Sequence, residues 1–302
     1  MITLKLSDLS PVELQEYLQY AIAPRPICLA STIDKEGNVN LSPFSFFNLF
    51  SISPPICVFS PSRRVRDNTT KHTLQNIQQV PECVINLVNY DMVQQTSLAS
   101  AEYPKGTNEF LKSGLTPLDS ELVKPPRVAE SPVQLECFIT KVISLGKTAG
   151  SGNMVIAEIK LMHITSSILD KNKKIDQEKI DLVARLGGDW YCRVIKESLF
   201  KVIKPNTNVG IGIDAIPQSI RESSILSGND LGQLGNVDRL PDETSINLYF
   251  QHNAELQKAL ISTNKNPKKR KNTIHLLAKA LLKDGKVTEA WKVLLAADSL
   301  VQ

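Results

Sequence analysis

Two long apolar, β-prone segments that follow one another constrain the fold of this chain most. They cover residues 133–145 and 154–164, and residues 146–153 (GKTAGSGN) between them have the glycines and small polar side chains of a hairpin loop. A second such pair, residues 26–33 and 39–50, flanks the turn sequence DKEGN. Strands joined by short turns pair antiparallel, whereas parallel strands need long crossovers. The segments therefore predict a closed or partly closed antiparallel barrel rather than a doubly wound parallel sheet.

Shorter elements complete this mainly β domain, which we place at residues 1–205. Further apolar strands are predicted at residues 56–60 and 83–87. Short helices are predicted between the strands, near residues 73–79, 92–100 and 107–112. Strands dominate, so the helices are insertions in a β fold.

The composition changes after residue 205. Residues 206–245 are rich in Gly, Asp, Asn, Ser and Pro and have little periodicity, which predicts an extended linker or arm. Residues 246–302 have helical periodicity and predict a C-terminal α-helical extension that ends in a helical hairpin. Residues 278–294 resemble one tetratricopeptide-like helix pair. Because such repeats are normally stable only in groups of about three, we favour a helical cap on the barrel or on a partner subunit.

Composition and charge narrow the class of protein. The chain has 302 residues, 42% of them hydrophobic, and a formal charge of +4, which is too small a surplus to argue for nucleic acid. The basic run at residues 265–271 is interpreted as a solvated loop between helices, with contact to an acidic partner as the alternative. There is no apolar signal core or membrane-length run, so we expect a soluble, cytoplasmic protein without membrane contact.

Cysteines, histidines and common motifs point away from metal and nucleotide sites. The sequence has no GxGxxG, P-loop, HExxH or GxSxG motif. The histidines are widely separated, so we expect no metal cluster: His72, His163, His252 and His275. The cysteines form no CxxC pair, and we expect reduced, mostly buried thiols: Cys28, Cys57, Cys83, Cys137 and Cys192.

An aromatic strand followed by a basic loop is the best candidate for a site. Residues 40–50 (NLSPFSFFNLF) mix aromatic side chains with hydroxyls and amides, although a core strand with tolerated polar residues would look the same. Residues 60–73 (SPSRRVRDNTTKHT) then concentrate cations and hydroxyls before a helix start, which suits a phosphate. A solvated basic loop would explain the charges equally well. The order of the two segments favours a flat ligand that carries a phosphate.

Three segments make the sequence resemble a known family. They read APRPICLASTIDKEGNVNLSPFSFFNLFSISPPICVFSPSRR, then KHTLQNI, then EKIDLVARLGGDWYCRV. In this order and spacing they are similar to the flavin reductase-like family of FMN-binding split-barrel proteins, which includes flavoredoxins and the reductase components of two-component monooxygenases. The likeness spans about residues 15–200 and does not extend to residues 206–302.

The resemblance implies an FMN-binding split β-barrel that forms a homodimer, with each FMN near the subunit interface. Ser31 and Thr32 would lie near the ribityl chain, and Tyr191 would close over the ring or contact it. The isoalloxazine would lie along Ser45, Phe46, Phe47 and Asn48. The phosphate would be held by Ser60, Arg64, Lys71 and Thr73. Replacing Lys71 and Thr73 together by alanine is then expected to weaken FMN binding by about 2–4 kcal/mol.

One position departs from the family pattern. The family usually has Lys-Asp-Thr at the end of the basic loop, and this chain has Lys71-His72-Thr73. The cation and the hydroxyl are kept. Histidine stands where relatives have aspartate, so the role of that aspartate does not carry over to this chain.

The resemblance further implies that the chain is an NAD(P)H:flavin oxidoreductase, in which NADH or NADPH passes a hydride to N5 of FMN. Electrons would continue to free flavin, a partner oxygenase or another acceptor. No catalytic residue is assigned, because the flavin supplies the chemistry. The alternatives are a flavoredoxin-like electron carrier without direct NAD(P)H turnover, and a flavin-binding scaffold with a protein-interaction helical tail. A role like that of pyridoxamine-phosphate oxidases fits the motif order less well.

Overall fold

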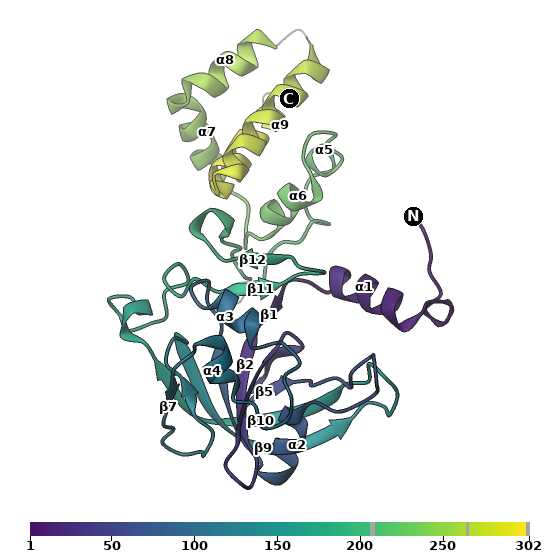
Figure 1. The fold of residues 1–302 in the computed structure, drawn as a ribbon. Helices are drawn as coiled ribbons and strands as arrows, with labels where there is room; N and C mark the ends of the chain where they lie inside the picture. Colours follow the sequence, from purple (N-terminus) through teal and green to yellow (C-terminus); the bar gives the residue numbers. More distant parts are fainter. Residues whose placement is uncertain (206–208, 264–265, 300–302) are drawn as a thin grey trace. The chain divides into compact units, whose positions relative to one another are not determined.

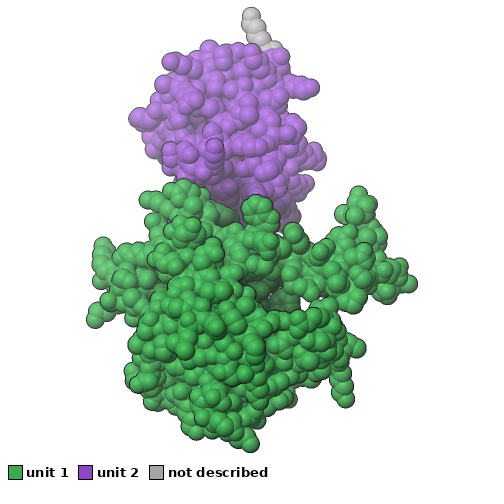
Figure 2. Space-filling view, in the orientation of Figure 1, with its two compact units in different colours: residues 1–200 green, residues 201–302 purple. Residues whose placement is uncertain are grey.

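The computed structural model describes residues 1–205, 209–263 and 266–299. It divides into two compact units, Met1–Phe200 and Lys201–Gln302 (Figure 2). Each unit has a hydrophobic core of its own, and each is described by itself below. Of the helices in the described ranges, none combines the length and the apolar character that a membrane span requires.

Unit 1 is built on a seven-stranded sheet with the strand order β3-β2-β6-β9-β10-β5-β4. All of its strand pairs are antiparallel, which confirms the predicted antiparallel β fold and excludes a doubly wound sheet. The strands are β2 (Cys28–Ile33), β3 (Val39–Phe44), β4 (Phe47–Ile52), β5 (Pro55–Phe59), β6 (Glu82–Leu87), β9 (Val133–Ser144) and β10 (Asn153–Ile164).

The hairpin of β9 and β10 is the longest pairing in the sheet. Its register runs from Asn153 opposite Ser144 to Ile164 opposite Val133, as the two apolar segments at residues 133–145 and 154–164 predict. The register shifts twice along β10, and such irregularities bend a strand. The glycine-containing loop at residues 145–152 closes the hairpin and, as shown below, reaches the candidate site.

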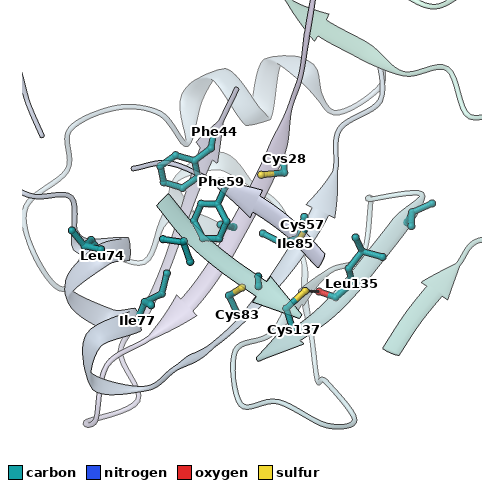
Figure 3. Close-up of a cluster of buried hydrophobic side chains, with 14 of the residues drawn as sticks. Cys28, Phe44, Cys57, Phe59, Leu74, Ile77, Cys83, Ile85, Leu135 and Cys137 are labelled. Carbon is teal, nitrogen blue, oxygen red and sulfur yellow. Dashed lines mark hydrogen bonds between the residues drawn. The ribbon is translucent and has the colours of Figure 1, made fainter. Parts of the chain in front are cut away.

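Four of the five cysteines lie in the core of the sheet (Figure 3). Cys28, Cys57, Cys83 and Cys137 are at most 1% exposed and pack among side chains such as Phe44 and Phe59, as the sequence predicts for small buried thiols. They come from four different strands, and Figure 3 shows them within one cluster. Burial raises the pKa of the Cys28 thiol, because the thiolate would lose its hydration.

Short helices and two small sheets surround the main sheet. Helices α2 (His72–Gln79), α3 (Val93–Leu98) and α4 (Glu109–Ser113) form where the sequence predicts them. One small sheet has the order β1-β11-β12, with β1 (Arg25–Pro26), β11 (Val183–Arg185) and β12 (Tyr191–Arg193). The other pairs β7 (Pro117–Leu118) with β8 (Arg127–Val128). Single 3-10 turns are η1 (Leu6–Asp8), η2 (Ser166–Ile168) and η3 (Lys196–Ser198).

Helix α1 (Pro11–Ala21) is not anticipated by the sequence analysis. Its start has a clear signal, because Ser10 accepts a hydrogen bond from the backbone of Glu13, the Glu13 carboxylate accepts one from the backbone of Ser10, and Pro11 occupies the first turn. None of its residues is buried, and Figure 1 shows it extending from the region of β1 and β11. The helix is only weakly amphipathic and is followed by segments with a clear strand pattern, so the sequence pattern does not reveal it.

Unit 2 is helical. It contains α5 (Gln218–Arg221), α6 (Gly228–Gly235), α7 (Glu243–His252), α8 (Ala254–Ser262), α9 (Pro267–Lys283) and α10 (Val287–Ser299). The predicted C-terminal helical hairpin corresponds to α9 and α10, and α7 packs against α10. Trp291 is fully buried at the centre, and its Nε1 donates to the carbonyl of Leu234 at 3.0 Å.

Two sequence expectations for unit 2 need correction. In the described part of residues 206–245 the chain is not an extended linker, because α5 and α6 lie there and bury Ile220 and Leu234 in the core. Apolar residues that are sparse among Gly, Asp and Ser give no periodic signal, although they reach the core. The basic run is also not a loop in its described part, since residues 267–271 form the first turn and a half of α9. The two units meet at residues 200 and 201, close to the predicted boundary at 205.

Candidate functional site

Two adjoining cavities in unit 1 hold most of the predicted site residues. The first has a volume of about 500 Å³ and the second about 750 Å³, which are ordinary sizes for ligand sites. Five residues line both cavities, so the two form one continuous groove: Leu18, Gln19, Ser45, Phe46 and Ser60. The walls come from α1, from the connection between β3 and β4, and from the chain that leaves β5.

The first cavity, here called the apolar cavity, has an aromatic wall. Ser45 and Phe46 connect β3 to β4, and Phe47 and Asn48 begin β4, so these four predicted residues line it together. The backbone N–H of Ser60 donates to the carbonyl of Phe46 at 2.9 Å, which fixes this segment beside the end of β5. Its other lining residues are mostly apolar, among them Leu18, Ile22, Pro24, Phe50, Val58 and Met154. Such walls suit a flat, largely apolar ring.

The second cavity, here called the cationic cavity, combines cations with hydroxyl groups. Arg63 and Lys71 line it, and neither makes an ion pair with any residue that the structure describes. The Arg63 guanidinium donates to the neutral side chain and carbonyl of Asn68, at 2.6 and 2.5 Å. The lining hydroxyls are those of Ser60, Ser62, Thr148 and Ser151. Uncompensated cations beside hydroxyl donors favour an anionic group such as a phosphate.

Lys71 is partly buried. Burial is the main cause that lowers the pKa of its ammonium, and the nearby charge of Arg64 lowers the pKa further. Its Nζ lies 5.9 Å from the centroid of the Phe44 ring. A charged group held in this environment without an acidic partner gains from an anion in the cavity.

The β9–β10 loop forms one side of the cationic cavity. The N–H of Arg63 donates to the carbonyl of Ser151 at 2.8 Å, and the N–H of Gly150 donates to the carbonyl of Arg63 at 3.2 Å. Gly150 has a φ of +83°, which favours glycine there. A Cβ at Gly152 would lie 2.6 Å from the Ser60 hydroxyl, so the close approach of the loop also depends on glycine. The hairpin loop is therefore part of the site, which the sequence analysis does not assign.

Two predicted phosphate ligands, Arg64 and Thr73, face a different set of groups. Arg64 Nε lies 3.1 Å from Glu102 Oε1, and its Nη1 donates to Thr69 and Thr70. Thr73 is 1% exposed, and its hydroxyl donates to Asn40 Oδ1 at 2.7 Å. Both residues line a small third cavity of about 20 Å³, which has room for about one water molecule. Of the predicted set, Ser60 lines the groove, Arg64 and Thr73 line the third cavity, and Lys71 lines both.

The Thr73 contact belongs to a buried network. Asn40 Nδ2 donates to Glu109 Oε1 at 2.8 Å, and the N–H of Leu41 donates to Glu109 Oε2 at 3.0 Å. Burial raises the pKa of Glu109, while these hydrogen bonds act in the opposite direction. The network connects α4, β3 and the first turn of α2, so it holds the end of the basic loop in place.

Three further predicted residues do not line the groove in this chain. Ser31 and Thr32 are fully buried in β2, and Thr32 Oγ1 accepts a hydrogen bond from Asn76 at 3.3 Å. Tyr191 lies in β12, with its ring centroid 4.5 Å from the guanidinium carbon of Arg185. None of the three lines either groove cavity.

His72, the departure from the family pattern, is the first residue of α2 and is half-buried. Burial lowers its pKa, and the charges of Arg64, Lys105 and Lys71 lower it further. The imidazole therefore favours its neutral form. It lines the small third cavity and not the groove.

The sequence does not predict that α1 and the residues beside it line the groove. The residues concerned are Leu9, Pro11, Leu14, Gln15, Leu18, Gln19, Ile22 and Arg25. The capping box at Ser10 would have indicated the helix. Nothing local in the sequence would have placed that helix over the aromatic strand.

An antiparallel sheet carries an aromatic cavity and an adjoining cationic cavity, and this combination suits a flat ligand with an anionic tail. The flavin reductase like domain matches residues 20–178, so this chain belongs to the flavin reductase-like family. The resemblance stated from the sequence is thereby confirmed.

Relatives and solved structures agree with this assignment. An uncharacterized protein from Aquifex aeolicus is 37% identical over 181 residues, which cover 60% of this chain and 90% of that protein. Nitrilotriacetate monooxygenase component B from Bacillus cereus superposes with a TM-score of 0.61 at 25% identity, over 68% of this chain and 98% of that one. A split-barrel protein from Shewanella frigidimarina gives a TM-score of 0.57 at 27% identity, over 66% and 96% of the two chains. The split-barrel fold is confirmed.

Proposed function

We propose that unit 1 binds FMN in the groove and acts as an NAD(P)H-dependent flavin reductase. The observation that carries this proposal is the pair of cations without acidic partners, Arg63 and Lys71, beside an aromatic cavity. A phosphate would neutralise the cations, and an isoalloxazine would fill the apolar cavity between α1 and residues 45–48.

The residues present fit the phosphate and the ring of FMN. The hydroxyls of Ser60, Ser62 and Ser151 can donate to phosphate oxygens, and Arg63 and Lys71 can add charge-assisted bonds. Phe46 and Phe47 offer an apolar surface to a ring, with Asn48 as a polar contact at its edge. FMN, when bound, supplies hydride acceptance and electron donation. The chain needs to bind and orient the cofactor and to exclude water around the ring, and it needs no acid–base pair.

The reductase activity draws its support from the family and from named neighbours. Besides the Bacillus cereus monooxygenase component, 2-nitrobenzoate 2-nitroreductase NbaA from Pseudomonas fluorescens superposes with a TM-score of 0.60 at 25% identity. We propose that NADH or NADPH is the hydride donor of this chain, and that free flavin, a partner oxygenase or another acceptor takes the electrons.

A homodimer is the proposed state of unit 1. Large apolar side chains are exposed on α1 and on β4, an edge strand of the main sheet: Tyr17, Tyr20, Ile22, Leu49, Phe50 and Ile52. Monomers seldom expose large contiguous apolar patches, and open edge strands are prone to pairing. A second copy over this surface would also cover the mouth of the apolar cavity, which Phe50 and Ile22 line. A molar mass of one chain by light scattering at micromolar concentration would refute the dimer.

The test is a titration of flavin-free protein with FMN, followed by NADH and by NADPH without oxygen. A reductase binds FMN and loses the visible flavin absorbance with at least one of the two nucleotides. A protein that binds FMN but is reduced by neither is a carrier of the flavoredoxin type, which is the second candidate. A protein that does not bind FMN refutes the proposal altogether.

A further inference from the structure

Helix α1 forms a wall of the groove although it contributes nothing to the hydrophobic core. Leu18 and Gln19 line both cavities, Leu14 lines the cationic one, and Ile22 lines the apolar one. No residue of α1 is buried. A helix without core contacts needs other contacts to hold it over a site, and the structure shows two.

The first contact is made by Arg25, in the strand that follows α1. Its Nη1 donates to the carbonyls of Gln19 and Ile22, at 2.5 and 2.6 Å, and its Nη2 donates to the carbonyl of Leu186 at 2.7 Å. Arg25 is only 7% exposed and has no ion pair with a described residue. The carbonyl end of a helix carries partial negative charge, so the end of α1 supplies two of the three carbonyls that accept hydrogen bonds from this buried cation.

The second contact joins Tyr20 to the Gly187-Gly188 turn between β11 and β12. A Cβ on Gly187 would overlap the Tyr20 ring, and a Cβ on Gly188 would lie 2.6 Å from the Tyr20 hydroxyl. The ring therefore lies directly across the two glycines. It remains 58% exposed, so the glycine face is its contact with the domain.

The two glycines are required for different reasons. Gly188 has a φ of +56°, a backbone conformation that favours glycine whatever lies nearby. Gly187 has no positive φ, so its missing side chain matters through the space that Tyr20 occupies. An alanine at 187 thus removes the Tyr20 contact without straining the turn.

We propose that Arg25, Tyr20 and Gly187 are positioning residues that hold α1 as a wall of the flavin groove. The inference rests on the proposed function. The two glycines of the sequence LGGDWY leave the space in which the side chain of Tyr20 from α1 lies. When the contacts of these three residues are lost, α1 moves away from the groove and the flavin loses one wall of its site, while the core of unit 1 is unchanged.

The experiment compares Gly187→Ala, Tyr20→Ala and the double variant in the full chain. FMN affinity is measured by quenching of flavin fluorescence, and hydrogen exchange of residues 11–21 is measured in flavin-free protein. Each single variant is expected to raise the Kd for FMN about 3- to 10-fold and to speed exchange in α1. The double variant is expected to match the single ones, because all three remove the same contact.

Two control variants are matched to these changes. Tyr20→Phe keeps the ring over the glycines and is expected to bind FMN like wild type. Gly232→Ala adds a methyl group to a glycine with open space around it and is expected to change neither readout.

Several results would overturn the inference. Wild-type affinity in Gly187→Ala, or single effects that multiply in the double variant, would show that the contact does not position α1. A fall in Tm that accompanies and accounts for the weaker binding would make the residues merely structural. If wild-type protein fails to bind FMN, the proposed function is wrong. Hydrogen exchange in α1 then still tests whether the contact between Tyr20 and the two glycines holds the helix in place.

Discussion

Lys71 offers the sharpest test of the groove, because its ammonium makes no ion pair with any described carboxylate, although the charge of Glu102 acts on it from a longer distance. We expect Lys71→Ala to weaken FMN binding strongly while the fold persists. The side chain lines the cationic cavity, and its Nζ lies over the Phe44 ring rather than beside a carboxylate. Its removal takes away a ligand contact and breaks no ion pair.

The magnitude follows from the kind of bond that is lost. A hydrogen bond between a charged donor and an anion contributes about 1.5–3 kcal/mol. At about 1.4 kcal/mol per factor of ten, the Kd should rise about 10- to 150-fold. Thr73 is not expected to contribute to this loss, because its hydroxyl already donates to Asn40. We therefore expect Lys71→Ala alone to produce most of the loss that the sequence suggests for Lys71 and Thr73 together.

Fluorescence titration of flavin-free protein measures the effect, and Arg66→Ala is the matched control. Arg66 lies in the same loop and carries the same charge, but it pairs with Asp67 and Glu102 and lines neither groove cavity. The control should change the Kd less than about threefold, as befits an exposed, internally paired cation. Equal effects of the two variants would mean that only the net charge of the loop matters. An unchanged Kd in Lys71→Ala would place the phosphate elsewhere.

Three further predictions concern stability, pH and thiol reactivity. Thr73→Ala leaves the buried Asn40 oxygen without its donor, so we expect a loss of about 1–3 kcal/mol in unfolding free energy by denaturant titration, with little change in the Kd for FMN. FMN affinity should be highest below the lowered pKa of Lys71 and fall as the pH rises through it, because the phosphate binds the protonated amine; titrations of Lys71→Arg over the same alkaline range should be flat. In native protein, Ellman's reagent should modify the half-exposed Cys192 quickly and the four buried thiols only after unfolding; fast reaction of a second thiol would contradict the buried cluster.

The sheet could be predicted from sequence because its longest strands are neighbours in the chain. Strands β9 and β10 are joined by a loop with glycines, so local turn chemistry is enough to define their pairing. The pairings of β10 with β5 and of β6 with β9 join distant segments, and nothing local encodes them. The sequence does not predict α1, α5 and α6, because the apolar residues of these helices give no clear helical periodicity.

Within the site, sequence order identified the loop but not which of its adjacent arginines lines the groove. Arg63 and Arg64 are adjacent and chemically identical, and only the position of Glu102 separates their roles. Since Glu102 lies 38 residues away, no reading of the loop alone could make that distinction. The same holds for Thr73. Its position at the start of a helix suits a phosphate, but its hydroxyl donates a hydrogen bond to Asn40 Oδ1 in β3.

This division has a physical consequence for how the loop can bind an anion. A loop with every cation free would repel itself, whereas Glu102 pairs with the largely buried Arg64 and so helps to fix the loop before any ligand arrives. Arg63 is held by neutral oxygens of Asn68, which position the guanidinium without cancelling its charge. The paired Arg64 thus supports the loop, and in the proposed function Arg63 and Lys71 are left to bind the phosphate. A preorganised pair of cations loses less conformational entropy when an anion binds than a flexible pair does, so this arrangement would favour binding of the phosphate.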